Sequence, residues 1–441
     1  MELEVCELAP SDWQRMPISA VCERFTSGGT PSRKVPEYFT GLIPWVKTQE
    51  LTDGLLQDTD EHVTEAAVAA SSAKLLPPNT VLMAMYGATV GQLAVLARSM
   101  TCNQACAAMV VDSKKADYRF LYYQLLAARQ QIRSLSTGAA QQNLSGTQIK
   151  QFVLPFPHAE LQTEIADPLW QLDRRIDLLR QTNATLEAIA QALFKSWFID
   201  FDPVRAKAEG REPEGMDAAT AALFPAEFEE SALGLIPKGW KTGTFGDLAE
   251  LAKGSVNPLT APEEEFEHFS LPAFDAEQLP VFERGETIKS NKTRVPVGAV
   301  LHSKLNPHIP RVWLPSRIGA HAVCSTEFLP WVARRAASTE LVYCALTGSA
   351  FEASVRALVT GTSNSHQRVK PDQVAALEMI LAPVAVSDAF TRVVRPLLRR
   401  VGENRLTAKA LAELRDSLLP RLVSGKLRLP EAQEQLEGAA A

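Results

Sequence analysis

The chain has 441 residues, of which 46% are hydrophobic and 22% are charged. A chain of this length has enough apolar side chains for about three domains with cores of their own. The net charge of −6 argues at first sight against a protein that binds nucleic acid, because affinity for phosphates comes largely from Lys and Arg. The charge distribution changes this conclusion. Residues 198–234 alone carry nine acidic and three basic side chains, and this excess of six negative charges equals the net charge of the whole chain.

The first residues, MELEVCELAPSDW, lack the basic and apolar regions of a signal peptide. No apolar run reaches the roughly 18 residues that a membrane span needs, so we expect a cytoplasmic protein. Six cysteines are spread over the chain without the spacing of a disulfide framework. Cys102 and Cys106 could form a metal pair, but no set of Cys or His partners lies near them in the sequence, so we assign no metal.

The N-terminal portion, residues 1–157, is predicted to be a β-rich domain punctuated by turns. Near its end lies the stretch TGAAQQNLS, from Thr137 to Ser145, which is too polar for a core and carries no charge. From Phe120 to Pro157 there is no acidic residue at all, whereas three residues are basic. This composition favours contact with an anionic partner over packing.

A long helix is predicted over residues 158–200. Ten positions along it are spaced alternately by four and three residues, which is typical of a coiled-coil seam. A helix with this seam is at least about 50 Å long. The seam positions are Ile165, Leu169, Leu172, Ile176, Leu179, Asn183, Leu186, Ala190, Leu193 and Trp197.

The end of this helix, FKSWFIDF, concentrates aromatic residues with a spacing that one buried stripe cannot absorb. They form either a local core or a docking surface for a partner protein, because aromatic residues are enriched in interface hot spots. The sequence leaves both interpretations open. The residues assigned to partner docking are Phe194, Trp197, Phe198 and Phe201.

The acidic segment, residues 201–234, is predicted to link the helix to a second β-rich domain, residues 235–383. This second domain repeats the first. The stretch GWKTGTFGDLAEL corresponds to DWQRMPISAVCE near the start of the chain, which matches Trp240 with Trp13. The stretch TGTSNSHQRVK, from Thr360 to Lys370, corresponds to TGAAQQNLS and is likewise followed by an apolar segment ending in proline.

Residues 384–441 are predicted to form a second long helix and a C-terminal tail. Its seam repeats the first at a constant offset of 225 residues, which chance would rarely maintain. The positions are Phe390, Val394, Leu397, Val401, Asn404, Ala408, Leu411, Arg415, Leu418 and Leu422.

Two such seams in one chain should pack on each other. A pseudo-twofold relation between the repeats makes the helices antiparallel and places Asn183 opposite Asn404, where a pair of Asn side chains can fix the register. We therefore predict an α+β protein with two pseudo-symmetric α/β domains separated by two long antiparallel coiled-coil helices. Two unconnected helices, each lying on its own domain, would need wider apolar stripes.

The two polar loops carry the side chains that read DNA. Gln and Asn bond adenine bidentately, Arg bonds guanine, and Ser or Thr bonds phosphates or bases. A single such loop would more simply cap the next helix or strand, but a loop repeated on two domains with local basic excess reverses that preference. The candidate DNA-binding residues are Gln141, Gln142, Asn143, Ser145, Thr147, Lys150, Lys304, Asn306, His308, Arg311, Thr362, Asn364, His366, Gln367, Arg368 and Lys370.

The sequence carries no enzyme signature. It has no Gly-rich phosphate loop, no dinucleotide fingerprint, no HExxH motif, and no Asn-Pro-Pro-aromatic motif of the kind that amino-methyltransferases use. Asp200 and Asp202 alternate with apolar residues, and we interpret them as structural or partner-facing. We predict no catalytic residues in this chain.

Several segments resemble the specificity subunits of type I restriction-modification systems. IPKGW at the entry to the second domain, TGTSNSHQRVK, ALFKSWFIDFDPV and RDSLLPRLVSGKL all look like recurring segments of that family. The resemblance covers nearly the whole chain. The entry to the first domain departs from the pattern, because Trp13 precedes the proline in DWQRMPISAV.

The resemblance implies two target recognition domains, each reading one half of a bipartite DNA site, and long helices that dock the methyltransferase subunits. The chain would be a non-catalytic recognition subunit. Its partners would be double-stranded DNA, two methyltransferase subunits and restriction subunits, and S-adenosylmethionine, ATP and Mg²⁺ would bind only in those subunits. Two alternatives remain: a coiled-coil adaptor that does not read DNA, and an enzyme that acts on its own.

Overall fold

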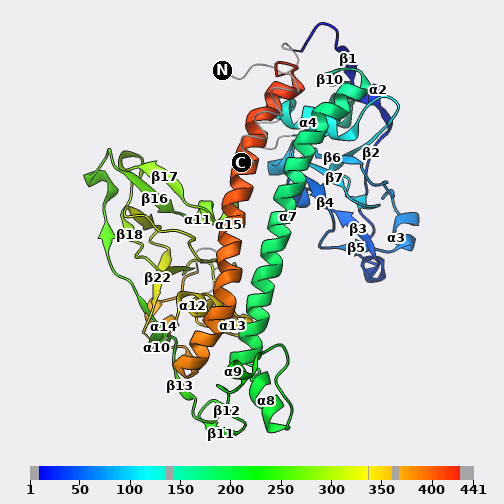
Figure 1. Ribbon diagram of the computed structural model, residues 1–441. Helices are drawn as coiled ribbons and strands as arrows, with labels where there is room; N and C mark the ends of the chain where they lie inside the picture. The colour runs from blue at the N-terminus through cyan, green and yellow to red at the C-terminus, as the bar shows by residue number, and fades with distance from the viewer. Residues whose placement is uncertain (1–8, 136–142, 336, 360–366, 428–441) are drawn as a thin grey trace. The chain divides into compact units, whose positions relative to one another are not determined.

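The computed structural model describes residues 9–135, 143–335, 337–359 and 367–427 (Figure 1). The chain forms two compact units. Unit 1 comprises Met1–Asp177 and Ala410–Ala441, and unit 2 comprises Leu178–Lys409. Each unit therefore contains one globular portion and a part of each long helix. Within the described residues, none of the helices is both long and apolar enough to span a bilayer.

The described part of unit 1 holds a five-stranded sheet in the order β2-β9-β6-β7-β4, a three-stranded sheet β5-β3-β8 and a ribbon β1-β10. The strands are β1 (Gln14–Pro17), β2 (Cys22–Ser27), β3 (Ile43–Val46), β4 (Leu55–Leu56), β5 (His62–Val63), β6 (Val81–Ala84), β7 (Leu93–Leu96), β8 (Thr101–Cys102), β9 (Cys106–Val111) and β10 (Val153–Phe156). The helices are α2 (Ile18–Val21), α3 (Glu65–Ala69), α4 (Tyr118–Ala127), α5 (Arg129–Ser134) and α6 (Gly146–Gln151).

The described part of unit 2 holds sheets in the orders β15-β18-β21-β16-β17 and β14-β22-β19-β20, and ribbons β11-β12 and β13-β23. The strands are β11 (Phe228–Ser231), β12 (Gly234–Pro237), β13 (Lys241–Thr244), β14 (Ala249–Leu251), β15 (Ser255–Val256), β16 (Glu265–Phe269), β17 (Val281–Arg284), β18 (Lys292–Arg294), β19 (Ala299–Ser303), β20 (Val312–Trp313), β21 (Ala322–Cys324), β22 (Phe328–Ala333) and β23 (Glu378–Leu381). The helices are α8 (Asp202–Ala208), α9 (Ala218–Ala221), α10 (Phe245–Leu248), α11 (Leu271–Glu277), α12 (Thr339–Leu346), α13 (Ser349–Ala357) and α14 (Pro371–Ala375).

The two units repeat the same plan, as the sequence predicts. In unit 1 the ribbon pairs Gln14 with Phe156, and in unit 2 the matching ribbon pairs Lys241 with Leu381. The turn before the central strand β6 contains Asn79 in the left-handed region at φ 65°, and the turn before β19 contains Gly298 at φ 78°. Only residues that tolerate positive φ fit such a turn, so the repeat extends to backbone conformation.

The core of unit 1 lies on both faces of its large sheet. In β6, Val81 and Met83 contact the cluster that includes α4 and the long helices, whereas Leu82 and Ala84 face a second apolar cluster. A strand buried on both faces reads as a continuous apolar run, which is why VLMA has no polar alternation. Asp117 caps α4 by accepting the backbone N–H of Arg119.

The two long helices are α7 (Ala159–Phe198) and α15 (Val384–Val423). Both seams are confirmed, because none of their positions is exposed. The pair is antiparallel. In unit 2, Trp197 packs against Phe390, with ring centroids 5.8 Å apart, while Asn183 lies beside Asn404.

The predicted pairing of the two Asn residues is also confirmed. Asn404 Nδ2 donates to Asn183 Oδ1 at 2.8 Å, and Asn183 Nδ2 donates to the carbonyl of Val401 at 3.2 Å. Both side chains are buried. Because a buried amide without a partner costs about 1–3 kcal/mol, this arrangement disfavours a slipped register of the helices.

The aromatic end of α7 is a core of unit 2. Phe194, Trp197, Phe198 and Phe201 are only 5–6% exposed, and they pack with rings from Phe224, Trp240 and Phe390. The local-core interpretation therefore describes the position of all four side chains in the chain by itself. A docking role for them stays a prediction that these contacts do not test.

The acidic segment after α7 folds against this core. Phe201 has φ 55°, which turns the chain sharply from α7 into α8, and Lys207 Nζ donates to the carbonyl of Ala221 at 3.1 Å. Phe224 is buried among the aromatic rings. The segment that the sequence presented as a linker therefore packs on unit 2 through its apolar residues and exposes its acidic ones.

Candidate nucleic-acid interface

Surface 1, made of Tyr86, Asn143, Thr147 and Lys150, lies where the first polar loop rejoins unit 1. Asn143 forms an antiparallel bridge with Tyr86, and the N–H of Leu144 donates to the carbonyl of Met85 at 2.9 Å. Because Met85 directly follows β6, the central strand of the sheet positions the loop exit. Asn143 is exposed, and Tyr86 is 43% exposed beside it.

Helix α6 holds both ends of this loop. Ser145 is its N-cap: the hydroxyl accepts the N–H of Gln148 at 3.1 Å, and the Gln148 side chain accepts the N–H of Ser145 at 2.8 Å. Gln148 Nε2 also donates to the carbonyl of Leu135 at 2.8 Å. Ser145 thus has the helix-capping role that competed with DNA contact in the sequence.

Thr147 and Lys150 are exposed on α6. Lys150 Nζ lies 5.2 Å from the centre of the Phe25 ring, a cation–π contact that leaves the ammonium group at the surface. Gln141 and Gln142 lie outside the described residues. Surface 1 therefore offers an amide, a hydroxyl, a phenol and one cation around the loop exit.

Surface 2, made of Lys304, Asn306, His308, Arg368 and Lys370, occupies the matching place in unit 2. Leu305 forms an antiparallel bridge with Arg368 where the second polar loop rejoins the fold, directly after β19. The N–H of Asn306 donates to the carbonyl of Gln367 at 2.8 Å. The described residues that follow the two polar loops are thus anchored to the fold in the same way.

The match between the surfaces reaches single residues. Tyr86 corresponds to Leu305, and the next residues, Gly87 and Asn306, are both left-handed, with φ of 74° and 50°. Asn tolerates this conformation better than most side chains, so Asn306 keeps the turn and adds an amide at a position where unit 1 has none. The backbone is therefore shared and the side chains differ.

Two arginines near surface 2 are held by carboxylates. Arg368 donates twice to Glu327, at 2.9 Å each, and this hydrogen bonding raises the pKa of Arg368. Arg311 donates to Asp275 at 2.6 and 2.8 Å, and only 13% of its side chain is exposed. To bond a guanine, either guanidinium would have to leave a bidentate carboxylate. Arg368 is the more accessible of the two, since 47% of its side chain is exposed.

The remaining candidates in unit 2 divide into described and undescribed residues. Lys370 is the N-cap residue of α14 and is exposed, as is His308, and among the described residues no carboxylate forms an ion pair with either of them or with Lys304. Gln367 is half-buried, and its carbonyl is bonded to Asn306. Thr362, Asn364 and His366 lie outside the described residues.

The chemistry of both surfaces is that of recognition. An amide and at least one cation lie at each loop exit, and the described residues contain no group of three or more His, Cys, Asp or Glu that could hold a metal ion. Sequence reasoning missed Tyr86, which follows β6 closely in the chain. It also missed Glu327 and Asp275, because nothing in the sequence links them to arginines 41 and 36 residues away.

Comparison with known proteins agrees with this architecture. A family model described as "Type I restriction modification DNA specificity domain" matches residues 10–188, which include the first globular portion and most of α7. The type I restriction enzyme MjaIX specificity subunit of Methanocaldococcus jannaschii is 25% identical, over 96% of this chain and 95% of that protein. The HindI specificity subunit of Haemophilus influenzae is 27% identical, over 62% of this chain and 69% of its own length.

The fold also matches a solved structure. The crystal structure of the S subunit of a type I restriction-modification system from M. genitalium superposes with a TM-score of 0.54 at 14% identity, covering 96% of this chain and 98% of that one. A repeated α+β protein with two long antiparallel helices is thus the class that the sequence and fold define. Within that class, the chain is similar over 96% of its length to a specificity subunit of a type I restriction enzyme, and its residues 10–188 match the model of that DNA specificity domain.

Proposed function

We propose that this chain reads a bipartite, asymmetric DNA target for a type I restriction-modification complex, with surface 1 and its loop on one half-site and surface 2 and its loop on the other. The observation that carries the proposal is the matched presentation of two unlike loops. The bridge Tyr86–Asn143 in unit 1 corresponds to Leu305–Arg368 in unit 2. Identical loops would read a palindrome, whereas Gln-Gln-Asn and His-Gln-Arg sequences suit different bases.

The partners in this proposal are DNA, methyltransferase subunits and restriction subunits. Two methyltransferase subunits suit a chain that repeats itself once. The chain itself contributes recognition and no catalysis, and S-adenosylmethionine, ATP and Mg²⁺ bind in the partner subunits. A cytoplasmic location stays a prediction.

The seam of the long helices provides a test, because it acts as a spacer between the half-sites. Inserting one heptad into α7 and one into α15, both next to the Asn183–Asn404 pair, keeps the seam spacing and adds about 10 Å. This length corresponds to about three base pairs. Methylation mapping in a host that carries the variant system should find the same half-sites with a longer gap between them.

A matched control inserts the heptad into α7 alone, which leaves the two seams unequal in length. This variant should lose stability and recognition together. If the double insertion left the gap unchanged, or changed the bases that are read, the helices would not set the spacing. If no sequence-selective methylation depended on the chain at all, the adaptor without DNA reading would be the better description.

A further inference from the structure

The two units differ in backbone bonding at the outer edges of their matched ribbons. In unit 1 the bonding pattern of β1-β10 turns the backbone groups of Val153, Pro155 and Pro157 away from β1. The two prolines have no N–H. Their carbonyls accept the side-chain amides of Gln124, at 3.0 Å, and of Gln162, at 2.9 Å. This edge is therefore closed within unit 1.

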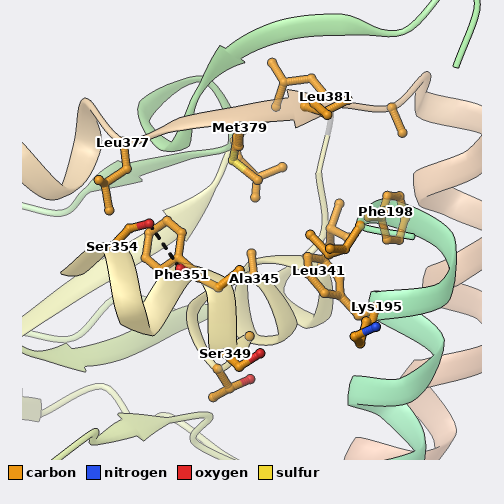
Figure 2. Close-up of a pocket in the computed structure, with 18 of the residues that line it drawn as sticks. Lys195, Phe198, Leu341, Ala345, Ser349, Phe351, Ser354, Leu377, Met379 and Leu381 are labelled. Carbon is orange, nitrogen blue, oxygen red and sulfur yellow. Dashed lines mark hydrogen bonds between the residues drawn. The ribbon is translucent and has the colours of Figure 1, made fainter. Parts of the chain in front are cut away.

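The matching edge of β23 in unit 2 is open. The backbone groups of Glu378, Ile380 and Ala382 point outward, and no described residue forms a hydrogen bond with the backbone of Ile380 or Ala382. Beside this strand lies a cavity of about 630 Å³, whose mainly apolar lining includes Met379 and Leu381 (Figure 2). Such a lining suits hydrophobic contacts rather than the hydrogen bonds by which bases are read.

A short turn between two sheets has, in contrast, the same backbone bonding in both units. Turn 1, residues 103–106, leads from β8 into β9. The N–H of Cys106 donates to the carbonyl of Asn103 at 3.3 Å, and the Asn103 side chain accepts the N–H of Ala105 at 3.0 Å. An Asn that bonds the backbone two residues on fixes a turn of this kind.

Turn 1 is anchored beside the exit of the first polar loop. The carbonyl of Ala105 accepts the N–H of Met85 at 2.9 Å, and the carbonyl of Met85 accepts the N–H of Leu144 at 2.9 Å. The turn, the residue after β6 and the loop exit therefore lie side by side. Because paired segments are about 4.8 Å apart, turn 1 lies about 10 Å from the loop exit.

Turn 2, residues 325–328, leads from β21 into β22 and repeats these bonds. The N–H of Phe328 donates to the carbonyl of Ser325 at 2.9 Å, and the Ser325 hydroxyl accepts the N–H of Glu327 at 3.3 Å. The carbonyl of Glu327 accepts the N–H of Lys304 at 2.9 Å, as Ala105 does from Met85. Both units thus hold this turn next to a loop exit.

The side chain at the tip of the turn differs between the units. Turn 1 has Gln104 at its second position, and turn 2 has Thr326 there. Both residues are exposed, so packing does not explain the difference. The loop exits likewise combine a shared backbone with different side chains, which is what two units that read different bases require.

Gln104 is also held in place by the chain that passes under turn 1. Thr30 Oγ1 donates to Gln104 Oε1 at 2.5 Å. The N–H of Gly29 donates to the carbonyl of Cys102 at 2.9 Å, and a Cβ on Gly28 would lie only 1.8 Å from that carbonyl oxygen. Because no side chain fits at Gly28, the glycine allows the close approach that places Thr30 against the turn.

We propose that Gln104 is a specificity-determining residue of unit 1, which bonds an adenine in the half-site that the first polar loop contacts. The inference rests on the proposed function, because it names a further base contact of the same unit. The Thr30 hydroxyl uses one lone pair of Gln104 Oε1, so the other accepts from adenine N6 while Nε2 donates to N7. A separation of about 10 Å from the loop exit corresponds to about three base pairs along the duplex.

Competition binding by the complex of the full chain with its methyltransferase subunits tests this proposal. The duplexes carry the target found by methylation mapping, with one base pair changed at a time. The wild-type complex should prefer one A·T pair of the first half-site by roughly 5- to 150-fold, and Gln104→Ala should abolish that preference alone. An unchanged preference would overturn the proposal. Equal weakening on every duplex would indicate a phosphate contact and would also overturn it.

A matched control replaces an exposed glutamine elsewhere in unit 1. Gln171→Ala on α7 should leave the preference at every base pair unchanged. If it abolished the same preference as Gln104→Ala, the effect would not come from turn 1, and the proposal would be wrong. Because Gln104 is exposed, Gln104→Ala should unfold at the same temperature as the wild type.

Thr30 serves as the positioning residue in this proposal. Thr30→Val keeps the shape of the side chain but removes the hydroxyl, and it should reduce the preference at the same A·T pair several-fold. In the Gln104→Ala background it should have no further effect, since it acts through Gln104. An effect of equal size in both backgrounds would show that Thr30 does not position Gln104.

Failure of this inference can be told apart from failure of the proposed function. The variant in which Gln141, Gln142 and Asn143 are replaced by Ala is measured on the same duplexes. If it relaxes the first half-site while Gln104→Ala has no effect, turn 1 does not contact bases and the proposed function stands. If the wild-type complex prefers no base pair at all, both the proposed function and this inference fail.

Discussion

The two units use different interactions at matched places in the same fold. Where the helices meet in unit 1, Asp173 accepts a hydrogen bond from the Tyr123 hydroxyl at 2.6 Å and from Arg415 at 2.5 Å. The seam offset matches Asp173 with Leu398 and Arg415 with Ala190, both apolar and buried. A repeated backbone therefore does not require a repeated core, provided that each buried polar group finds its partners.

The same lesson applies to the recognition surfaces. In unit 1 the loop exit exposes Tyr86 and Asn143, whereas in unit 2 the matching exit carries Arg368, which is already bonded to Glu327. The backbone bridge is common to both. Specificity can therefore diverge between the units without a change in how the loops are anchored.

Removal of an aromatic ring from unit 2 should have the largest effect on stability. Phe198→Ala deletes a buried ring that contacts Phe194, Trp240 and Phe390, and should lower the free energy of unfolding by about 3–5 kcal/mol. Urea titration of the isolated chain measures it. A loss below about 1 kcal/mol, combined with weak methyltransferase binding, would favour docking over the core.

Removal of the carboxylate in unit 1 should cost slightly less. Asp173→Ala leaves Arg415 largely buried without its main partner, and we expect a loss of about 3 kcal/mol in unfolding free energy. The triple variant Asp173→Leu, Arg415→Ala and Tyr123→Phe removes all three interacting polar groups together and should recover most of that loss. If the triple variant were less stable than Asp173→Ala, an apolar interior would not fit unit 1.

Acid should weaken unit 2 through His302, at a place where unit 1 has Met83. Burial lowers the pKa of His302 from 6.5 to about 4, so the unfolded chain takes up a proton first as the pH falls. Stability is therefore fully present above pH 6.5 and decreases as the pH falls toward 4, by at most about 3 kcal/mol. Unfolding curves for His302→Met should lack this contribution, and an identical pH profile for wild type and variant would contradict it.

The recognition surfaces should be separable. Substituting Asn143 together with Gln141 and Gln142 by Ala should relax one half-site by roughly 1–3 kcal/mol per lost bidentate contact, and substituting Gln367 and Arg368 should relax the other. Competition binding by the complex to duplexes altered in one half-site measures this. Equal weakening of both halves by either set would show that a loop does not belong to one half-site.

The Asn pair should have the smallest effect on stability. Asn183→Ala removes the acceptor of the Asn404 amide and should cost about 1–2 kcal/mol. Replacing both residues by Leu should restore or raise stability and weaken the preference for one register. Thermal unfolding and a cross-link between cysteines placed one heptad out of register would measure the two effects. If the variant with two Leu residues kept a single stable register, the rest of the seam would fix the register without the Asn pair.

The seam, the antiparallel pairing and the contact between Asn183 and Asn404 were predictable, because heptad spacing and a constant offset depend only on sequence position. The closed and open strand edges were not. Gln124 forms hydrogen bonds with residues that lie 31 and 299 positions away in the chain. Which residues of β10 face outward depends on its pairing register with β1, and the sequence does not reveal that register. The pairing of Arg311 with Asp275 depends likewise on how α11 folds back. Five of the candidate loop residues were chosen from composition and lie outside the described residues: Gln141, Gln142, Thr362, Asn364 and His366.

The open edge of β23 also makes the two repeats different from each other. The described residues offer this edge in unit 2, while Pro155, Pro157 and two glutamines close its counterpart in unit 1. The two repeats therefore differ in the backbone hydrogen-bonding groups that they leave unpaired at matched edges, at least among the described residues. The asymmetry of the molecule lies in its main chain as well as in the side chains of its loops.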